Sequence, residues 1–357
     1  MKKYKVAVIG ATGMVGQRFL SLLENHPLFE VNCLAASERS AGKKYSDAVK
    51  GWLLPAPMPK KFADMKVLNA ADVEKIANSV DFCFCAVNMK KEDIKELEYA
   101  YARAECPVVS NNSAHRGTDD VPMIIPEVNP EHLEVIAAQR KRLGVKRGFI
   151  AVKSNCSLQS YIPLLHPLKR FGIERVAVTT YQAISGAGKT FETMPEIYDN
   201  VIPFIGGEEE KSENEPLKIW GTVQGGRIVN AKEPLISAQC LRVPVSDGHT
   251  AACFVSFKNK PTKEEIISAW ENFSGEPQAL SLPSAPKKFI RYFSEDDRPQ
   301  PRLDRDLERG MAISAGRLRE DNIFDYKFIG LSHNTLRGAA GGAVLLAELL
   351  AAKGYFD

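Results

Sequence analysis

Cys156 is the side chain whose surroundings most favour covalent chemistry. It lies in the polar segment 154–157 (SNCS), directly before a run, 158–171, that can form a helix. The partial positive charge at a helix N-terminus lowers the pKa of a thiol and enriches the reactive thiolate. Most buried cysteines are small hydrophobes, but this polar context separates Cys156 from the other cysteines of the chain. We therefore interpret Cys156 as a candidate nucleophile.

A second polar cluster lies in the segment 239–250, where Arg242 is followed by His249. We expect a strand carrying Arg242 to lead through a turn to His249, so that one hairpin presents both side chains. An imidazole carries protons near neutral pH, and a guanidinium suits a planar carboxylate. The segment therefore predicts an acid/base group beside an anion-binding group. We expect the remaining histidines at the surface or in packing: His26, His115, His132, His166 and His333.

The segment 10–16 (GATGMVG) contains a GxxGxxG pattern. Its glycines permit a tight turn and the close approach of a pyrophosphate to a helix N-terminus. A bare glycine pattern is weak, but this one lies between a predicted strand, 5–9, and a predicted helix, 14–25, as a dinucleotide site requires. We favour dinucleotide binding over a purely structural turn.

The residues after the second predicted strand bear on the choice of cofactor. An NAD site usually places an acidic residue there to bind the ribose hydroxyls, whereas this chain has Ser37, Glu38, Arg39 and Ser40. An arginine between two hydroxyls suits a 2′-phosphate, because a guanidinium pairs bidentately with phosphate oxygens. The segment favours NADP; Glu38 could instead bind a ribose and keeps NAD possible, and a solvated loop is the alternative without a ligand.

The elements that position these residues fall into two groups. Short apolar runs alternating with helical sequence predict a doubly wound parallel sheet of the Rossmann type, with strands at 5–9, 31–36, 80–87 and 107–110. After about Phe149 the β-rich runs are longer and alternate in polarity, which is typical of half-exposed antiparallel strands, at 176–183, 236–243 and 251–258. We expect exposed loops or helix ends at 208–216 and 296–306, and a final helix, 336–352, that packs back onto the first domain.

The fold class is therefore α/β, with a dinucleotide-binding domain, 1–153 with 334–357, and a mixed α+β catalytic and dimerisation domain, 154–333. A length of 357 residues agrees with two domains. The net charge of +3 is spread along the chain without a basic block, so nucleic acid is not expected as a partner. The first apolar run is too short for a signal peptide or a spanning helix, which predicts no membrane association and a cytoplasmic location. The seven cysteines lack paired CxxC spacing, so we expect reduced thiols and no metal site.

Six motifs occur in an order that resembles the aspartate-semialdehyde dehydrogenase family. They are GATGMVG, ASERSAG at 36–42, the segment 111–116, SNCS, SGAGK at 185–189 and RVPVSDGHT at 242–250. The resemblance covers nearly the whole chain. The ASERSAG run and the polar segment 208–216 are more similar to the archaeal and fungal branch than to the common bacterial one.

The resemblance implies NADPH-dependent reductive dephosphorylation of L-aspartyl-4-phosphate to L-aspartate 4-semialdehyde, a step in lysine, methionine and threonine biosynthesis. Cys156 would attack the acyl phosphate and form a thioester. His249 would be the acid/base catalyst, and Gln182 would orient the intermediate. The family also implies a homodimer or homotetramer.

The resemblance also implies how substrate and cofactor are bound. Arg242 would bind the substrate carboxylate, Glu208 its amino group, and Lys211 with Arg116 the phosphate, near Asn112. Because 208–210 are consecutive glutamates, Glu209 or Glu210 could replace Glu208, and an acidic solvated loop is the alternative. The implied NADP contacts are Gly10, Thr12, Gly13, Met14, Val15, Gly16, Ser37, Arg39, Ser40, Ser185, Gly186, Gly188 and Asn334; tight helix packing is the alternative for the last four.

Two other functions remain to be weighed. A paralogous reductase would use the same nucleophile on another acyl donor, as in N-acetyl-glutamyl-phosphate reductase or malonyl-CoA reductase. Arg242 argues against both, and the pair Arg116 and Lys211 suits one small phosphate better than a large CoA leaving group. A cofactor-sensing regulator would have no reason to keep Cys156, Gln182, Arg242 and His249 together.

Overall fold

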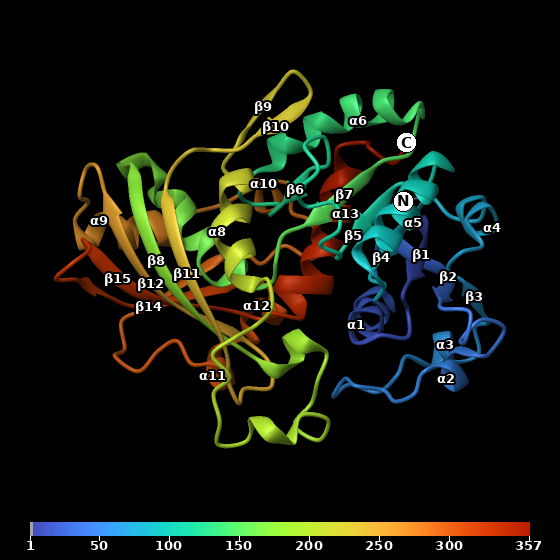
Figure 1. Ribbon diagram of the computed structural model, residues 1–357, viewed down its shortest axis with the longest axis horizontal. Coiled ribbons are helices and arrows are strands. Elements are labelled where there is room, and N and C mark those ends of the chain that lie inside the picture. The colour runs from blue at the N-terminus through green and yellow to red at the C-terminus, as the bar shows by residue number, and fades with distance from the viewer. Residues whose placement is uncertain (1–2) are drawn as a thin grey trace.

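The computed structural model describes residues 3–357 and places two sheets beside each other (Figure 1). The first is a seven-stranded sheet in the order β3-β2-β1-β4-β5-β7-β6, with every neighbouring pair parallel. Its strands are β1 (Tyr4–Ile9), β2 (Phe29–Ala36), β3 (Val67–Asn69), β4 (Phe82–Cys85), β5 (Val108–Ser110), β6 (Met123–Ile124) and β7 (Ile150–Lys153). The strand order reverses between β1 and β4, which is where doubly wound sheets bind their ligands.

Helices surround this sheet and connect its strands. They are α1 (Met14–Leu23), α2 (Tyr45–Ala48), α3 (Lys60–Ala63), α4 (Val73–Ala77), α5 (Lys91–Arg103), α6 (Ile136–Leu143) and, at the C-terminus, α13 (Gly341–Ala352). Helix α13 is buried from Gly341 to Leu350 and packs against α1, β5 and β7, because its sequence is apolar on all sides. The expected return of the C-terminus to the first sheet is therefore observed. The start of the expected helix differs, since Leu336–Ala340 forms a π turn.

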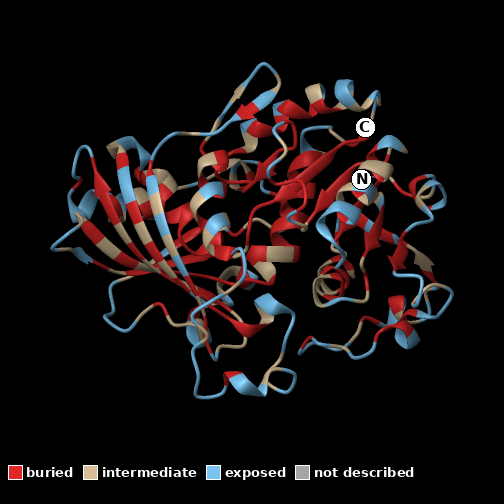
Figure 2. Ribbon diagram, viewed as in Figure 1, coloured by how far each residue is buried: buried red, intermediate tan, exposed pale blue. Residues whose placement is uncertain are grey.

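The second sheet has six strands in the order β11-β8-β12-β15-β14-β13. They are β8 (Ile173–Gln182), β11 (Leu235–Arg242), β12 (His249–Phe257), β13 (Ile290–Phe293), β14 (Ile313–Glu320) and β15 (Tyr326–Ser332). Figure 2 shows buried residues alternating with more exposed ones over much of β8, β11 and β12, as the sequence pattern predicts for these segments. The sheet is mixed rather than antiparallel, because β11 pairs parallel with β8 and β13 pairs parallel with β14.

The expected hairpin from Arg242 to His249 is wrong. Strand β8 lies between β11 and β12, pairing parallel with the first and antiparallel with the second. Arg242 is opposite Gln182 in the β11–β8 register, and His249 begins β12. Three strand ends, rather than one hairpin, therefore bring Arg242, Gln182 and His249 to the same edge of the sheet.

Two further expectations about local structure are wrong. The run 158–171 is broken into a 3₁₀ turn Ser157–Ser160, a short helix α7 (Ile162–Leu165) and a 3₁₀ segment His166–Phe171. Pro163 and Pro167 lie in this run, and a proline inside a helix lacks the amide donor that the preceding turn needs. The segment 208–216, expected as an exposed loop or helix end, instead forms most of helix α8 (Glu208–Ile219), whose acidic first turn suits the positive end of a helix dipole.

The remaining elements are short. They are the hairpin β9 (Thr222–Gln224) and β10 (Arg227–Val229), and the helices α9 (Lys263–Glu271), α10 (Glu276–Ala279), α11 (Pro301–Asp304) and α12 (Leu307–Gly310). Helix α11 falls in the stretch 296–306, which was expected to hold loops or helix ends. Within the described chain, no helix is both long and apolar enough to span a bilayer.

Candidate active site

Cys156 lies just beyond the carboxyl end of β7, immediately before the 3₁₀ turn Ser157–Ser160 that links the first sheet to the second domain. The turn is held by Asn155, whose Oδ1 accepts hydrogen bonds of 2.7 Å from both the amide and the hydroxyl of Ser157. Gly338 packs directly on the cysteine, since a Cβ added to Gly338 would lie 2.8 Å from the Cβ of Cys156. The thiol is therefore fixed between the turn and the C-terminal segment. All seven cysteines are free, and Cys156 is the only one that is not buried.

The thiol contacts His249. The distance from Cys156 Sγ to His249 Nε2 is 3.4 Å, and the backbone amide of Ala183 donates to His249 Nδ1 over 3.0 Å. Because Nδ1 accepts this bond, the neutral ring carries its proton on Nε2 and donates it toward the sulfur. Burial and the nearby Arg242 lower the pKa of His249 to about 3. His249 is therefore a neutral hydrogen-bond donor at this position, rather than a base for the thiol.

The environment of Cys156 does not lower its pKa, which corrects the expectation from the helix N-terminus. Burial and then the negative charge of Glu208 raise the pKa of the thiol, although Lys153, Arg116 and Arg242 oppose them. The physical reason is that the helix expected after Cys156 is a four-residue 3₁₀ turn, which supplies little dipole. Any thiolate must be stabilised by neighbouring cations.

Glu208 is the glutamate of its run that enters the site. Its carboxylate accepts bonds from the side chains of Asn155 (2.9 and 3.0 Å), Gln182 (3.2 Å) and Lys211 (2.8 Å). Burial opposes ionisation of Glu208, but the charge of Lys211 and these hydrogen bonds hold its pKa below the usual value. Glu209 instead accepts a bond from the backbone amide of Cys240. The structure thus places an ionised carboxylate at position 208, and links it directly to Gln182.

Arg242 is buried beside His249. Its Nη1 donates to the carbonyl of Ala183 over 2.7 Å, so the residue that fixes the imidazole also fixes the guanidinium. Gly186 closes over both groups, since an added Cβ would lie 2.9 Å from Arg242 Nη1 and 3.1 Å from His249 Nε2. Of the five N–H groups of a guanidinium, the structure engages one, which leaves the others for an anionic ligand.

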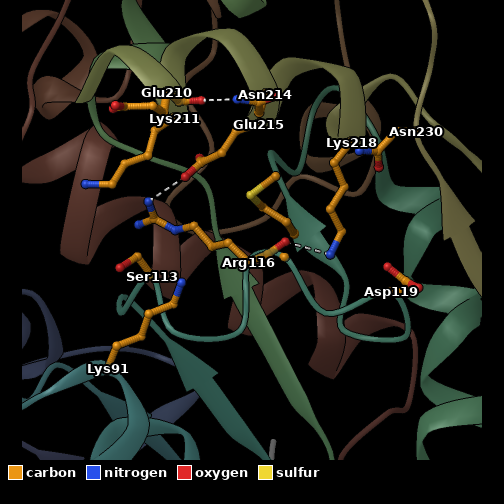
Figure 3. Close-up of a pocket in the computed structure, with 12 residues that line it drawn as sticks. Lys91, Ser113, Arg116, Asp119, Glu210, Lys211, Asn214, Glu215, Lys218 and Asn230 are labelled. Carbon is orange, nitrogen blue, oxygen red and sulfur yellow. Dashed lines mark hydrogen bonds and ion pairs between the residues drawn. The ribbon is translucent and has the colours of Figure 1, made fainter. Parts of the chain in front are cut away.

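Arg116 is a second buried guanidinium, held by three partners. Figure 3 shows its pairing with Glu215 of α8, at 2.9 Å, and Lys211 extending to the same side. It also donates to the carbonyls of Lys153 (3.0 Å) and Asn111 (3.2 Å). Three of its five N–H groups are thus engaged, and two remain.

Arg116 and Lys211 stand at the boundary of two cavities. One, of about 330 Å³, is the pocket of Figure 3. The other, of about 390 Å³, contains Cys156 and is lined by Asn112, whose amide donates to the buried carboxyl of Glu98 over 2.9 Å. Cations and the thiol therefore share one space, which suits a small anion bound beside the nucleophile.

The glycine turn has the features of a pyrophosphate cradle. Gly10 has a φ of +88°, and a Cβ there would lie 2.3 Å from the carbonyl oxygen of Ala86 at the end of β4. Gly16 lets α1 pack on the turn, because its Cβ would lie 2.3 Å from the carbonyl oxygen of Gly10. Helix α1 begins after Gly13 with neither a side-chain cap nor an acidic residue in its first turn. Its first amides are thus available to a phosphate, and a dinucleotide fits here.

The other expected cofactor residues lie on both sides of this cradle. Arg39 is exposed in the turn after β2, between Ser37 and Ser40. Asn334 donates to the hydroxyl of Ser185 over 2.9 Å and accepts from the amide of Gly248 over 2.8 Å. Those of the set that line the Cys156 cavity are Val15, Ser185, Gly186 and Asn334, whereas Thr12, Met14 and Gly188 do not line it. The cavity therefore joins the nucleophile to the cofactor side of the molecule.

Sequence analysis missed three polar residues of the site: Lys153, Asn155 and Glu215. Asn155 was read only as part of the polar context of Cys156. Lys153 is the last residue of the otherwise apolar strand β7, and its sequence context gave no sign of a role in the site. Glu215 lies seven residues after Glu208, on the same face of α8, and i, i+3/i+4, i+7 spacing would have revealed it had the segment been read as a helix.

The chain is similar to known proteins over nearly its whole length. Residues 5–136 match the family model of the semialdehyde dehydrogenase NAD binding domain, and residues 165–337 match that of the semialdehyde dehydrogenase dimerisation domain. An aspartate-semialdehyde dehydrogenase of Aspergillus fumigatus is 43% identical, covering 99% of this chain and 98% of its own. One of Archaeoglobus fulgidus is 44% identical, covering 98% of each chain. The crystal structure of the Candida albicans aspartate semialdehyde dehydrogenase with NADP has a TM-score of 0.89 at 40% identity, covering 99% of this chain and 100% of that one.

Proposed function

Because the chain belongs to the aspartate-semialdehyde dehydrogenase family, we propose that it reduces L-aspartyl-4-phosphate to L-aspartate 4-semialdehyde with NADPH, for lysine, methionine and threonine biosynthesis. The observation that carries the proposal is the contact between Cys156 and His249 in a cavity shared with Arg116 and Lys211. A thiol beside a proton donor suits acyl transfer, and two cations beside it suit a phosphate leaving group. The relatives supply the name of the substrate.

In the first step, the thiolate of Cys156 attacks the acyl carbon. The C–S bond forms, the C–O bond to phosphate breaks, and phosphate leaves with the bonding electrons. Arg116 and Lys211, which line the cavity of Cys156, would bind the phosphate, and the Nε2–H of His249 would donate to the acyl oxygen as it becomes negative. The product of this step is a thioester on Cys156.

NADPH, when bound at the glycine cradle, supplies the hydride that reduces the thioester carbon. The Nε2–H of His249 again stabilises the oxygen on which negative charge develops. Collapse of the tetrahedral species breaks the C–S bond, releases the aldehyde and returns the thiolate beside the same donor.

Recognition of the amino acid falls to groups of opposite charge. Arg242 would bind the α-carboxylate and Glu208 the α-amino group, on either side of the thiol. Ionised Glu208 is tied to Gln182, which would thereby orient the acyl group. An N-acetylated substrate has no ammonium for Glu208 to pair with, which disfavours the N-acetyl-glutamyl-phosphate alternative. Malonyl-CoA likewise has no ammonium group for Glu208 to bind.

The proposal extends to organisation and location. We assign cofactor binding to residues 1–153 with 334–357, with Arg39 on the 2′-phosphate, and catalysis to residues 154–333. The match to a dimerisation domain supports an oligomer, which we propose is a homodimer or homotetramer. Seven free thiols suit a reducing compartment, and we propose the cytoplasm.

The test is reduction of NADP⁺ by L-aspartate 4-semialdehyde, followed at the absorbance band of the reduced nicotinamide. We expect steady turnover only when phosphate or an equivalent oxyanion is present, and a lower kcat/KM with NAD⁺. N-acetylglutamate semialdehyde is the control substrate. Preference for that substrate would contradict the assignment of Glu208 and move the function to the paralogous reductase.

A further inference from the structure

The thiolate of Cys156 lacks an obvious stabilising charge. His249 is neutral and already donates Nε2–H toward the sulfur, and Glu208 carries a negative charge in the same cavity. Arg242 lies beside the imidazole, where it donates to the carbonyl of Ala183, and its proposed ligand is the substrate carboxylate. Arg116 is paired with the carboxylate of Glu215, which offsets its charge. Lys211 is likewise paired with the carboxylate of Glu208, and the cation lining this cavity that remains is Lys153.

Lys153 is placed unlike the other cations of the site. It is the last residue of β7, it is buried at 4% exposure, and it lines the cavity that contains Cys156. Its Nζ donates to the carbonyl oxygen of Gly338, and within residues 3–357 no carboxylate lies within ion-pair distance of that nitrogen. Its charge is therefore not offset by a bonded acid.

Gly338 connects the lysine to the nucleophile. The glycine Cα packs against Cys156 so closely that an added Cβ would lie 2.8 Å from the cysteine Cβ. The carbonyl of the same residue receives the lysine nitrogen. The ammonium of Lys153 and the side chain of Cys156 thus contact the same residue, Gly338 of the π turn Leu336–Ala340. Because the site is buried, the attraction between an ammonium and a thiolate there is weakly screened.

The geometry points to Lys153 as a positioning residue that sets the charge state of Cys156, its buried ammonium stabilising the thiolate that attacks the acyl phosphate. The inference rests on the proposed role of Cys156 as nucleophile. The thiol–amine and thiolate–ammonium forms of the pair differ only in the position of one proton. Release of the thiolate in the last step restores the same pair.

The titration of Lys153 supports this assignment. Burial, and next the charge of Arg116, lower its pKa to about 7, whereas Cys156, Glu215 and Glu208 act in the opposite sense. Formation of the thiolate therefore favours protonation of the lysine, and loss of the lysine charge disfavours the thiolate. The groups that face the pair are Arg116, Arg242, Glu208, Glu215 and His249.

The test is the pH dependence of Cys156 alkylation by iodoacetamide, with the modified residue identified by peptide mass spectrometry. Lys153→Gln keeps a donor for the Gly338 carbonyl but removes the charge. We expect its alkylation profile to move to higher pH by about one unit, with a rate about tenfold lower near neutral pH, because only the thiolate reacts. The two rates should converge at high pH, where both thiols are ionised; a defect that persists there would mean lost access and would overturn the inference.

Lys218→Gln is the matched control. Lys218 is also buried, with a pKa lowered to about 8 by burial, but it donates to the backbone carbonyls of Arg116, Thr118 and Val121. Its replacement should leave the alkylation profile of Cys156 in place. An unchanged profile in Lys153→Gln, or an equal shift in both variants, would overturn the assignment.

A second measurement does not depend on the fold of Lys153→Gln. In the wild-type protein and in Cys156→Ala, lysine side chains labelled with ¹³C at Cε are titrated by NMR. The signal of Lys153 should titrate at lower pH in Cys156→Ala than in the wild type, because the thiolate no longer stabilises its ammonium. An unchanged titration of Lys153 would overturn the inference. Neither readout requires turnover, so the failure of the proposed function, seen as normal activity in Cys156→Ala, is a separate result.

Discussion

Replacement of Cys156 by alanine is expected to lower kcat by at least about 10⁴-fold, because the acyl group then has no protein nucleophile to which it can be transferred. The cofactor cradle at Gly10–Gly16 lies between β1 and α1, whereas Cys156 follows β7, so the substitution does not change the cradle. The Kd for NADPH should therefore stay within about twofold of wild type. Stopped-flow reduction measures the first quantity, and fluorescence titration of NADPH measures the second.

Two further variants serve as controls for this prediction. Cys156→Ser keeps the size of the side chain but replaces a thiol with a far weaker nucleophile, and it should be nearly as inactive as the alanine variant. Cys253→Ala removes a fully buried thiol from β12 and should retain turnover per folded molecule, at a modest cost in stability. Turnover by Cys156→Ala within tenfold of wild type would exclude the thioester route.

Replacement of His249 by alanine is expected to lower kcat by roughly 10² to 10⁴-fold, the usual contribution of a proton donor at a reacting oxygen. The site geometry adds a sharper expectation. Because Ala183 holds Nδ1 as an acceptor, His249 donates to the sulfur and does not deprotonate it. Loss of turnover should therefore not be accompanied by a large rise in the pKa at which Cys156 is alkylated.

His249→Gln serves as the partner variant, since its amide can donate from near the position of Nε2 but cannot deliver a proton. It should recover part of the activity lost in the alanine variant. If His249→Ala instead moves the alkylation profile of Cys156 to much higher pH, the imidazole acts as the base that deprotonates the thiol. The tautomer assigned from the hydrogen bond with Ala183 would then be wrong.

Local sequence was sufficient to predict the glycine turn and to propose Cys156 as the nucleophile, which the structure places in contact with His249. Gly10 was expected to permit a tight turn between strand and helix, and the structure shows why a glycine is needed there, with a φ of +88° and close contact with Ala86. Cys156 was identified by its polar neighbours. Both conclusions depend on residues adjacent in the chain, and for this reason the sequence alone could reach them.

Contacts between distant segments could not be reached in this way. Arg242 and His249 were expected in a hairpin because they are close in sequence, yet β8 separates their strands, and only the sheet order reveals it. The segment 208–216 was expected as an exposed loop or helix end, although it lies in helix α8, whose buried face carries Glu208 and Glu215 into the site. The prediction that the pKa of Cys156 is lowered was wrong for the same reason. Burial and the charge of Glu208 on α8 raise the pKa of the thiol, and the short 3₁₀ turn after it supplies little opposing dipole.

The measurement that tests the account most directly is a single turnover of wild-type enzyme with L-aspartate 4-semialdehyde and NADP⁺ in the absence of phosphate. We predict a burst of NADPH of about one equivalent per active site, as expected for an accumulating acyl-enzyme. Mass spectrometry should then find an acyl adduct on the peptide that contains Cys156, and added phosphate should remove it and start steady turnover. Steady NADPH formation without phosphate and without an adduct on Cys156 would contradict the thioester mechanism.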